Sequence, residues 1–124
     1  MRIFKTNWFA RYSRREGIGD DGLRNAIERA ERGQIDADLG GDLIKQRIAR
    51  EGQGRSGGFR TVIVFRKGHR AFFVYGFAKN AIENIDRAQL NELKELAKDL
   101  LSFSEHAIER QVEIDELTEI PNDD

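Results

Sequence analysis

The 124-residue sequence contains no cysteine. This absence excludes disulfide bonds, thiolate metal sites and cysteine nucleophiles, and it favours a reducing compartment. No stretch approaches the roughly 20 apolar residues that a membrane-spanning helix requires. The first five residues are too short and too interrupted by basic side chains to act as a secretory signal. We therefore expect a cytoplasmic protein with no membrane contact.

Proline is nearly absent as well, since the only one is Pro121, in an acidic stretch near the end of the sequence. The length is typical of one domain, and a domain of this size buries about two-thirds of its unfolded surface without needing a disulfide or a metal. We found no internal repeat and no linker. The sequence predicts a single domain over residues 1–124, with an acidic tail from about residue 112 that either adds a strand or frays.

The net charge of −1 says little about partners, but the charges are unevenly distributed. Residues 43–79 carry nine Lys and Arg and one acid, whereas residues 105–124 carry eight acids and one base. Such a polarised chain could bring its basic part to phosphate. The acidic part either repels nucleic acid locally or forms a solvated surface.

Periodicity predicts a short strand at residues 1–5, and Thr6 is a candidate cap for a helix carrying Trp8. A second helix begins at Asp20 or Asp21 and stops near Gly33. Residues 43–49 form a strand, and residues 59–66 and 70–78 form an antiparallel hairpin. Two more helices follow, one capped by Asp86 with Gln89 and one from Ser104 through residue 111. This order predicts an α+β fold, a small and mostly antiparallel sheet with helices packed on one face.

Basic side chains on the strands are the strongest functional signal. Ile44 and Ile48 must face the helices, so Lys45 and Arg47 face the open side of the sheet. Arg60 and Lys79 could converge with them, because neighbouring strands bring side chains within about 5 Å. Cations on a rigid surface bind a phosphodiester and stabilise the added charge of a pentacoordinate transition state. A solvated basic face without a partner is the competing interpretation.

Other candidate features carry less weight. The glycine-rich segment 51–58, which contains Arg55, lacks the phosphate-loop pattern and is best interpreted as a connection between strands. His69 and His106 are expected at the surface, and no residue spacing matches a metal site. We expect Phe73, Tyr75 and Phe77 to share one face and pack in the core, with base stacking as the alternative.

Three ordered segments resemble the RelE/HigB branch of bacterial toxins in the RelE/ParE superfamily of toxin–antitoxin systems. They are Ile44–Ile48, then Gly57–Ile63, then Tyr75–Asn80, followed by a further likeness from Lys79-Asn80 to Asn84-Ile85. The likeness covers about residues 1–103, and residues 43–85 are its most specific part. No single motif is diagnostic.

The resemblance implies a toxin of a type II system, a ribosome-dependent endoribonuclease that cleaves messenger RNA and is held inactive by a cognate antitoxin, usually of helix-turn-helix type. In such enzymes the 2′-hydroxyl of the RNA attacks the adjacent phosphate, and neither metal nor other cofactor is needed. The resemblance assigns phosphate binding to Lys45 and Arg47, charge stabilisation to Arg60, and a role as acid or anchor to Lys79. We also expect Arg55, Arg66 and Asn80 to bind RNA, with Arg55 reaching it from the glycine-rich segment.

The sequence departs from the family at two positions where members with a described mechanism carry an arginine and a tyrosine. Here these positions hold Asn80 and Asp86, so the general base and acid stay unassigned. Two alternatives to the nuclease remain. One is a ParE-like toxin that inhibits DNA gyrase without cutting RNA, and the other is a non-catalytic RNA-binding module.

Overall fold

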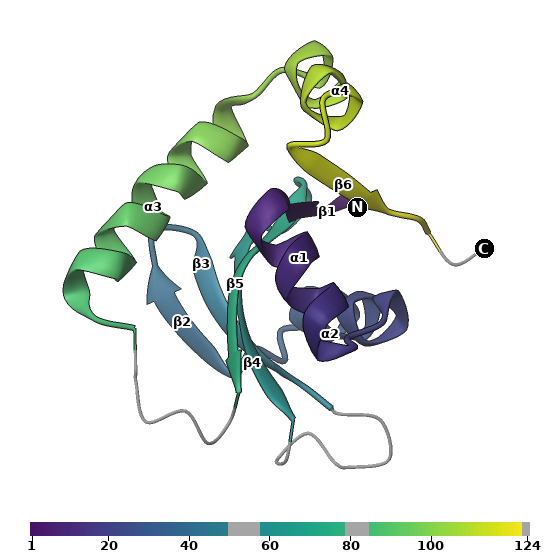
Figure 1. Ribbon diagram of the computed structural model, residues 1–124. Helices are drawn as coiled ribbons and strands as arrows, with labels where there is room; N and C mark the ends of the chain where they lie inside the picture. The colour runs from purple at the N-terminus through teal and green to yellow at the C-terminus, as the bar shows by residue number, and fades with distance from the viewer. Residues whose placement is uncertain (50–57, 79–84, 123–124) are drawn as a thin grey trace.

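The computed structural model describes residues 1–49, 58–78 and 85–122, and all structural statements below refer to these ranges. Six strands and four helices follow one another along the chain (Figure 1). They are β1 (Ile3–Thr6), α1 (Asn7–Glu16), α2 (Asp20–Glu31), β2 (Ala37–Gly40), β3 (Leu43–Ile48), β4 (Phe59–Phe65), β5 (Ala71–Ala78), α3 (Arg87–Ser102), α4 (Glu105–Glu113) and β6 (Leu117–Ile120). No helix among these residues is both long and apolar enough to cross a membrane.

The strands form one sheet in the order β2-β3-β4-β5-β1-β6. All neighbouring strands are antiparallel except the pair β1 and β5, which is parallel. The predicted hairpin of residues 59–66 and 70–78 corresponds to β4 and β5, and it occupies the middle of the sheet. The predicted α+β class with a mostly antiparallel sheet is therefore confirmed.

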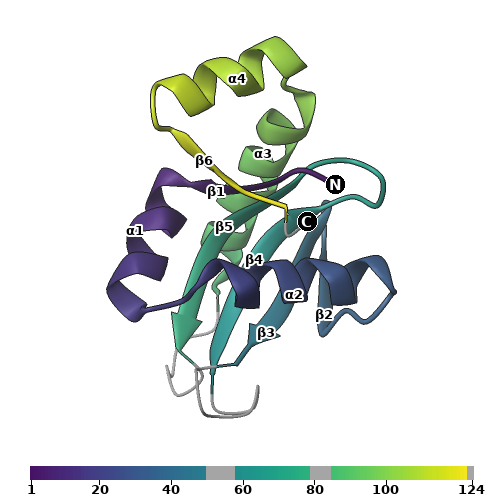
Figure 2. The same cartoon turned by 90° about the vertical axis from the view of Figure 1, so that its right-hand side faces the viewer.

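Helices α1 and α2 cover one face of this sheet (Figure 2). Phe9, Leu23 and Ile27 from the helices form a buried cluster with Ile44, Ile48, Phe59, Ile63 and Phe73 from the strands. Ile44 and Ile48 thus face the helices, as their spacing predicted. Since side chains alternate along a strand, Lys45 and Arg47 point to the opposite face.

The opposite face is also covered in part, which corrects the expectation of helices on one face only. Helix α3 lies there, across the sheet from α1 and α2 (Figure 1). Its Ala97 and Leu100 join a second buried cluster with Val62, Val64 and Phe72 of the strands. Both faces of β4 and β5 carry apolar side chains, so each face requires a covering layer.

Local sequence explains where most of the helices begin. The Thr6 hydroxyl accepts a hydrogen bond from the Phe9 N–H at 3.3 Å, and the Ser104 hydroxyl accepts one from the Ala107 N–H. Asp86 and Gln89 form the predicted capping box. Helix α2 differs from its prediction, because its cap is Gly19 and Asp20 and Asp21 lie in its first turn. Their negative charges there interact favourably with the positive end of the helix dipole.

A β-bulge in β5 changes the predicted arrangement of its aromatic residues. Val62 pairs with Tyr75, but Ile63 pairs with Phe73, which leaves Val74 as an extra residue. Phe73 packs in the α1–α2 cluster, whereas Val74 and Tyr75 both pack in the α3 cluster. Phe77 pairs with Arg60 and so shares its face. The expectation that Phe73, Tyr75 and Phe77 share one face is therefore wrong.

The acidic C-terminal segment adds a strand. β6 pairs with β1 from Ile3↔Ile120 to Thr6↔Leu117. The guanidinium of Arg2 donates two hydrogen bonds to Glu119, each at 2.8 Å, and also pairs with Glu105 and Glu109. Several of the acids near the C-terminus thus neutralise one arginine at the start of the chain.

Strand β2 was not predicted, and a buried glutamine helps to hold it. The side chain of Gln46 is fully buried and lies on the α2 side of β3. Its amide donates to the carbonyls of Ala26 and Gln34 and accepts from the Asp36 N–H at 2.8 Å. These bonds hold the chain between α2 and β2 against β3 and so position Asp36 beside Arg47.

Replacing this glutamine should destabilise the fold. We expect Gln46→Leu to lower the free energy of unfolding by about 2–3 kcal/mol, because it leaves buried backbone groups without partners. Gln34→Leu is the matched control, since that side chain is exposed and only its backbone carbonyl joins the network; its effect should stay within about 0.5 kcal/mol. Urea denaturation of both variants measures the difference, and equal stabilities would contradict this role for Gln46.

Candidate functional site

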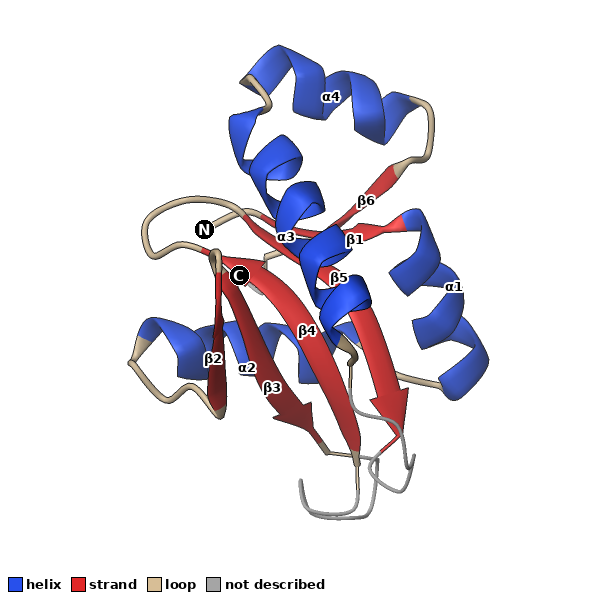
Figure 3. Cartoon of the chain, turned by 90° about the vertical axis from the view of Figure 1, so that its left-hand side faces the viewer, coloured by secondary structure: helices blue, strands red, loops and turns tan. Residues whose placement is uncertain are grey.

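Three of the predicted cations lie on one face of adjacent strands. In the β3–β4 ladder Arg47 pairs directly with Arg60, and Lys45 pairs with Val62. Directly paired residues have Cβ atoms about 4.5–5.5 Å apart. The predicted convergence of Lys45, Arg47 and Arg60 at one end of the sheet therefore agrees with the strand register. In Figure 3 this end of β3, β4 and β5 extends beyond α3.

The pairing continues onto β5, where the residues that pair with β4 on this face are aromatic. Arg60 pairs with Phe77, and Val62 pairs with Tyr75. Two rows thus cross the sheet, one made of Arg47, Arg60 and Phe77 and the other of Lys45, Val62 and Tyr75. We call the three cations Lys45, Arg47 and Arg60 the cationic cluster.

Arg60 has unused hydrogen-bonding capacity. Its Nη1 is buried and has no hydrogen-bond partner among the described residues, although the residue as a whole is only half-buried. A buried donor without an acceptor costs free energy, commonly about 1–3 kcal/mol. An anion that reached this nitrogen would remove that cost, so the guanidinium is suited to donate a hydrogen bond to a phosphate oxygen.

Arg47 is held by a carboxylate. Asp36 Oδ2 accepts a hydrogen bond from the Arg47 backbone N–H at 2.7 Å, and Asp36 Oδ1 lies 3.3 Å from Arg47 Nη2. The buried Arg29 lies 3.8 Å from the same carboxylate and donates to the Arg47 carbonyl. The Arg47 side chain remains 44 % exposed. Asp36 therefore orients the guanidinium while part of its donor set stays open to solvent.

The interactions around Asp36 favour its ionised form. Burial is the largest single influence and opposes ionisation, but hydrogen bonds from the Arg47 backbone and guanidinium, with the charges of Arg47 and Arg29, outweigh it. The pKa of Asp36 is consequently lower than that of an ordinary aspartate.

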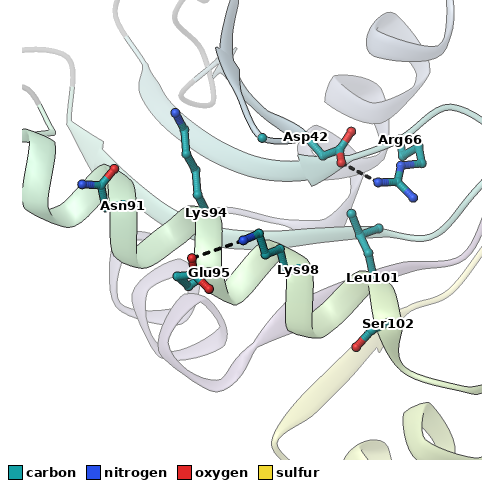
Figure 4. Close-up of a pocket in the computed structure, with 9 residues that line it drawn as sticks. Asp42, Arg66, Asn91, Lys94, Glu95, Lys98, Leu101 and Ser102 are labelled. Carbon is teal, nitrogen blue, oxygen red and sulfur yellow. Dashed lines mark hydrogen bonds and ion pairs between the residues drawn. The ribbon is translucent and has the colours of Figure 1, made fainter.

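Arg66 is not part of the cationic cluster. It follows the far end of β4, six residues beyond Arg60, which corresponds to about 20 Å along a strand. There it pairs with Asp42 at 2.6 Å beside a hollow of about 760 Å³ (Figure 4). Lys94 and Lys98 of α3 line the same hollow. The RNA-binding role of Arg66 stays a prediction, and the fold does not bring Arg66 to the cationic cluster.

The remaining predicted site residues, Lys79, Arg55 and Asn80, lie outside the described residues. His69 and His106 are exposed, as expected. In the part of the chain that the structure describes, no group of three or more His, Asp or Glu side chains could hold a metal ion.

Trp8 was predicted only as part of a short helix and was missed as a candidate site residue. The residue is 40 % exposed. Its ring stacks on Tyr75 at 4.8 Å between centroids and on Tyr12 at 5.2 Å. No sequence signal revealed this contact, since it depends on α1 lying along the edge of β5 beyond the end of β1.

The structure therefore defines a class of protein, a small α+β domain with a cationic cluster on one end of a sheet face. Comparison with known proteins gives the family. A protein-family model described as the RelE toxin of the RelE/RelB toxin–antitoxin system matches residues 1–120. The chain belongs to this RelE toxin family, which identifies it as a toxin of a toxin–antitoxin system and implies a cognate antitoxin. A search of curated proteins finds no match.

The role of Asp36 can be tested by the pH dependence of stability. Because its pKa is lower in the folded chain, its ionised form contributes stability that is fully present above about pH 4 and is lost as the pH falls through the lowered value. The stability difference between the wild type and Asp36→Asn should therefore shrink as the pH falls from 5 to 2, as measured by urea denaturation at several pH values. A constant difference would contradict the ion pair with Arg47.

Proposed function

We propose that this toxin is a ribosome-dependent endoribonuclease that cleaves messenger RNA through the cationic cluster. The observation that carries the proposal is the direct pairing of Arg47 with Arg60, two cations from separate strands on one partly open sheet face. Like charges side by side repel each other and destabilise a sheet. Their placement is explained by a polyanion that binds between them.

In the proposed reaction the RNA supplies its own nucleophile. The 2′-oxygen attacks the adjacent phosphorus and gives its proton to a base, while the bond from phosphorus to the 5′-oxygen breaks and that oxygen receives a proton from an acid. The products are a 2′,3′-cyclic phosphate and a 5′-hydroxyl end. The nucleophile belongs to the RNA, so the protein must supply only proton transfer, positioning and charge stabilisation.

Lys45 and Arg47 hold the phosphate backbone in this proposal, and Arg60 stabilises the pentacoordinate phosphorane. The buried Nη1 of Arg60, unpartnered among the described residues, supports its part. Preorganised donors of this kind commonly contribute the largest share of catalysis, because they need no rearrangement during the reaction. Lys79 keeps its predicted role as acid or anchor, and Arg55 and Asn80 keep theirs as RNA contacts.

Removal of the guanidinium should remove the activity while leaving the fold intact. We expect Arg60→Ala to lower the rate of messenger RNA cleavage on ribosomes by about 10²–10³ and to relieve growth arrest on induced expression. Arg110→Ala is the control, since Arg110 is an exposed residue of α4 that pairs with Glu113. Mapping of RNA ends gives the readout, and an active Arg60→Ala variant would refute the assigned surface.

Binding can be separated from cleavage with an RNA whose 2′-hydroxyls are methylated. We expect Lys45→Ala and Arg47→Ala each to weaken binding and to reduce the slope of log affinity against log salt by about 0.7, because each cation neutralises one phosphate of a single strand. Fluorescence anisotropy at several salt concentrations measures both quantities. If RNA binds normally but no cut appears on ribosomes, the chain is a non-catalytic RNA-binding module instead.

A further inference from the structure

A small hollow lies on the same sheet face as the cationic cluster. It has a volume of about 350 Å³, which is within the size range of small-ligand pockets. Helix α1, strand β5 and helix α3 all contribute to its wall. The lining residues are Trp8, Val74, Tyr75, Gln89, Glu92, Leu93 and Leu96. All of these residues belong to the described part of the chain.

Aromatic rings form one side of the hollow. Trp8 and Tyr75 stack at 4.8 Å between centroids, and Phe77 continues the row 6.2 Å beyond Tyr75. Trp8 is 40 % exposed, whereas a tryptophan packed in a hydrophobic core is mostly buried. Stacked aromatic rings with exposed surface suit a flat ligand, because every nucleobase has a π-face that stacks on them.

The cationic cluster adjoins these rings. Tyr75 pairs with Val62, whose partner on the other side is Lys45, and Phe77 pairs directly with Arg60. Adjacent strands are about 4.8 Å apart, so the cations and the rings lie within the span of one or two nucleotides. A nucleotide chain bound here would place its phosphates on β3 and β4 and its bases toward β5 and α1.

The side of the hollow formed by α3 offers polar groups to the edge of a base. Gln89 and Glu92 are exposed at the rim of the hollow, and neither the Glu92 carboxylate nor the Gln89 amide nitrogen has an ion-pair or hydrogen-bond partner among the described residues. A carboxylate accepts hydrogen bonds and cannot donate them. It would therefore select a base that presents N–H groups, and guanine presents two side by side, N1–H and the N2 amino group.

We propose that this hollow binds one nucleobase of the RNA held by the cationic cluster, stacked on Trp8 and Tyr75 with its donor edge toward Glu92. The inference rests on the proposed function and adds a base-specific subsite to it. Guanine is the preferred base. The other possible occupant, an apolar helix of a protein partner, would gain nothing from the adjacent cations or from an unpaired carboxylate.

Trp8 is the only tryptophan of the chain, so its fluorescence reports on the hollow directly. The probes are four short oligoribonucleotides with methylated 2′-oxygens, uniform in sequence except for one position that carries G, A, C or U. We expect binding to quench Trp8 fluorescence, with the G-containing probe binding about tenfold more tightly than the U-containing one.

Variants separate stacking from edge recognition. Trp8→Leu should weaken the binding of all four probes about tenfold, as measured by anisotropy, whereas Trp8→Phe should keep most of the affinity. Glu92→Gln should reduce the preference for G over U by severalfold without a general loss of binding. Glu95→Gln is the matched control, because Glu95 is an exposed carboxylate on the same helix that lines a different hollow; it should keep the preference.

The outcomes distinguish this subsite from the nuclease itself. Unchanged probe affinities in Trp8→Leu and Glu92→Gln would overturn the base subsite, while Arg60-dependent cleavage would leave the nuclease standing. Quenching with a preference for G, but without any cleavage on ribosomes, would support the subsite and overturn the nuclease. If RNA leaves Trp8 fluorescence unchanged and the purified antitoxin quenches it, the hollow binds protein and the proposal is wrong.

Discussion

Side-chain alternation across the β3–β4–β5 ladder is the constraint on which the rest of this structure depends. β4 lies between two antiparallel neighbours, and its residues alternate between the α1–α2 cluster and the α3 cluster. Phe59 and Ile63 are fixed in one layer, so Arg60 must face the other. A shift of the register by one residue would bury the arginine and expose the apolar residues. The hydrophobic cores thus set the position of the cations.

The bulge at Val74 has a comparable effect on the aromatic residues. Regular alternation would place Tyr75 and Phe77 with Phe73 beneath α1 and α2. The extra residue reverses the alternation in the second half of β5 and brings both rings to the face of Arg60. On the other side of the strand Gly76 leaves room for the ring of Tyr12, since a Cβ there would lie 2.6 Å from Tyr12 Cε2.

Hydrogen bonds and ion pairs at the two edges of the sheet hold the elements around the cationic cluster in place. Gln46 is buried on one side of β3 and holds the chain that carries Asp36, and Asp36 in turn orients Arg47 on the other side. At the opposite edge of the sheet Arg2 ties β6 and α4 to β1 through three glutamates. These acids are engaged with an arginine, and among the described residues the acidic side chain that pairs with the cationic cluster is Asp36.

The sequence by itself determined the α+β class, the central hairpin and most of the helix starts, because these depend on local periodicity and caps such as Ser104 and Asp86. It also placed Lys45, Arg47 and Arg60 on one face, since a strand with apolar neighbours allows only one alternation. It did not predict α3 on the second face, strand β2, the Asp36–Arg47 pair or the stacking of Trp8 on Tyr75. Those features depend on a bulge, on a buried side-chain amide and on contacts between elements far apart in the chain, which only the tertiary structure decides.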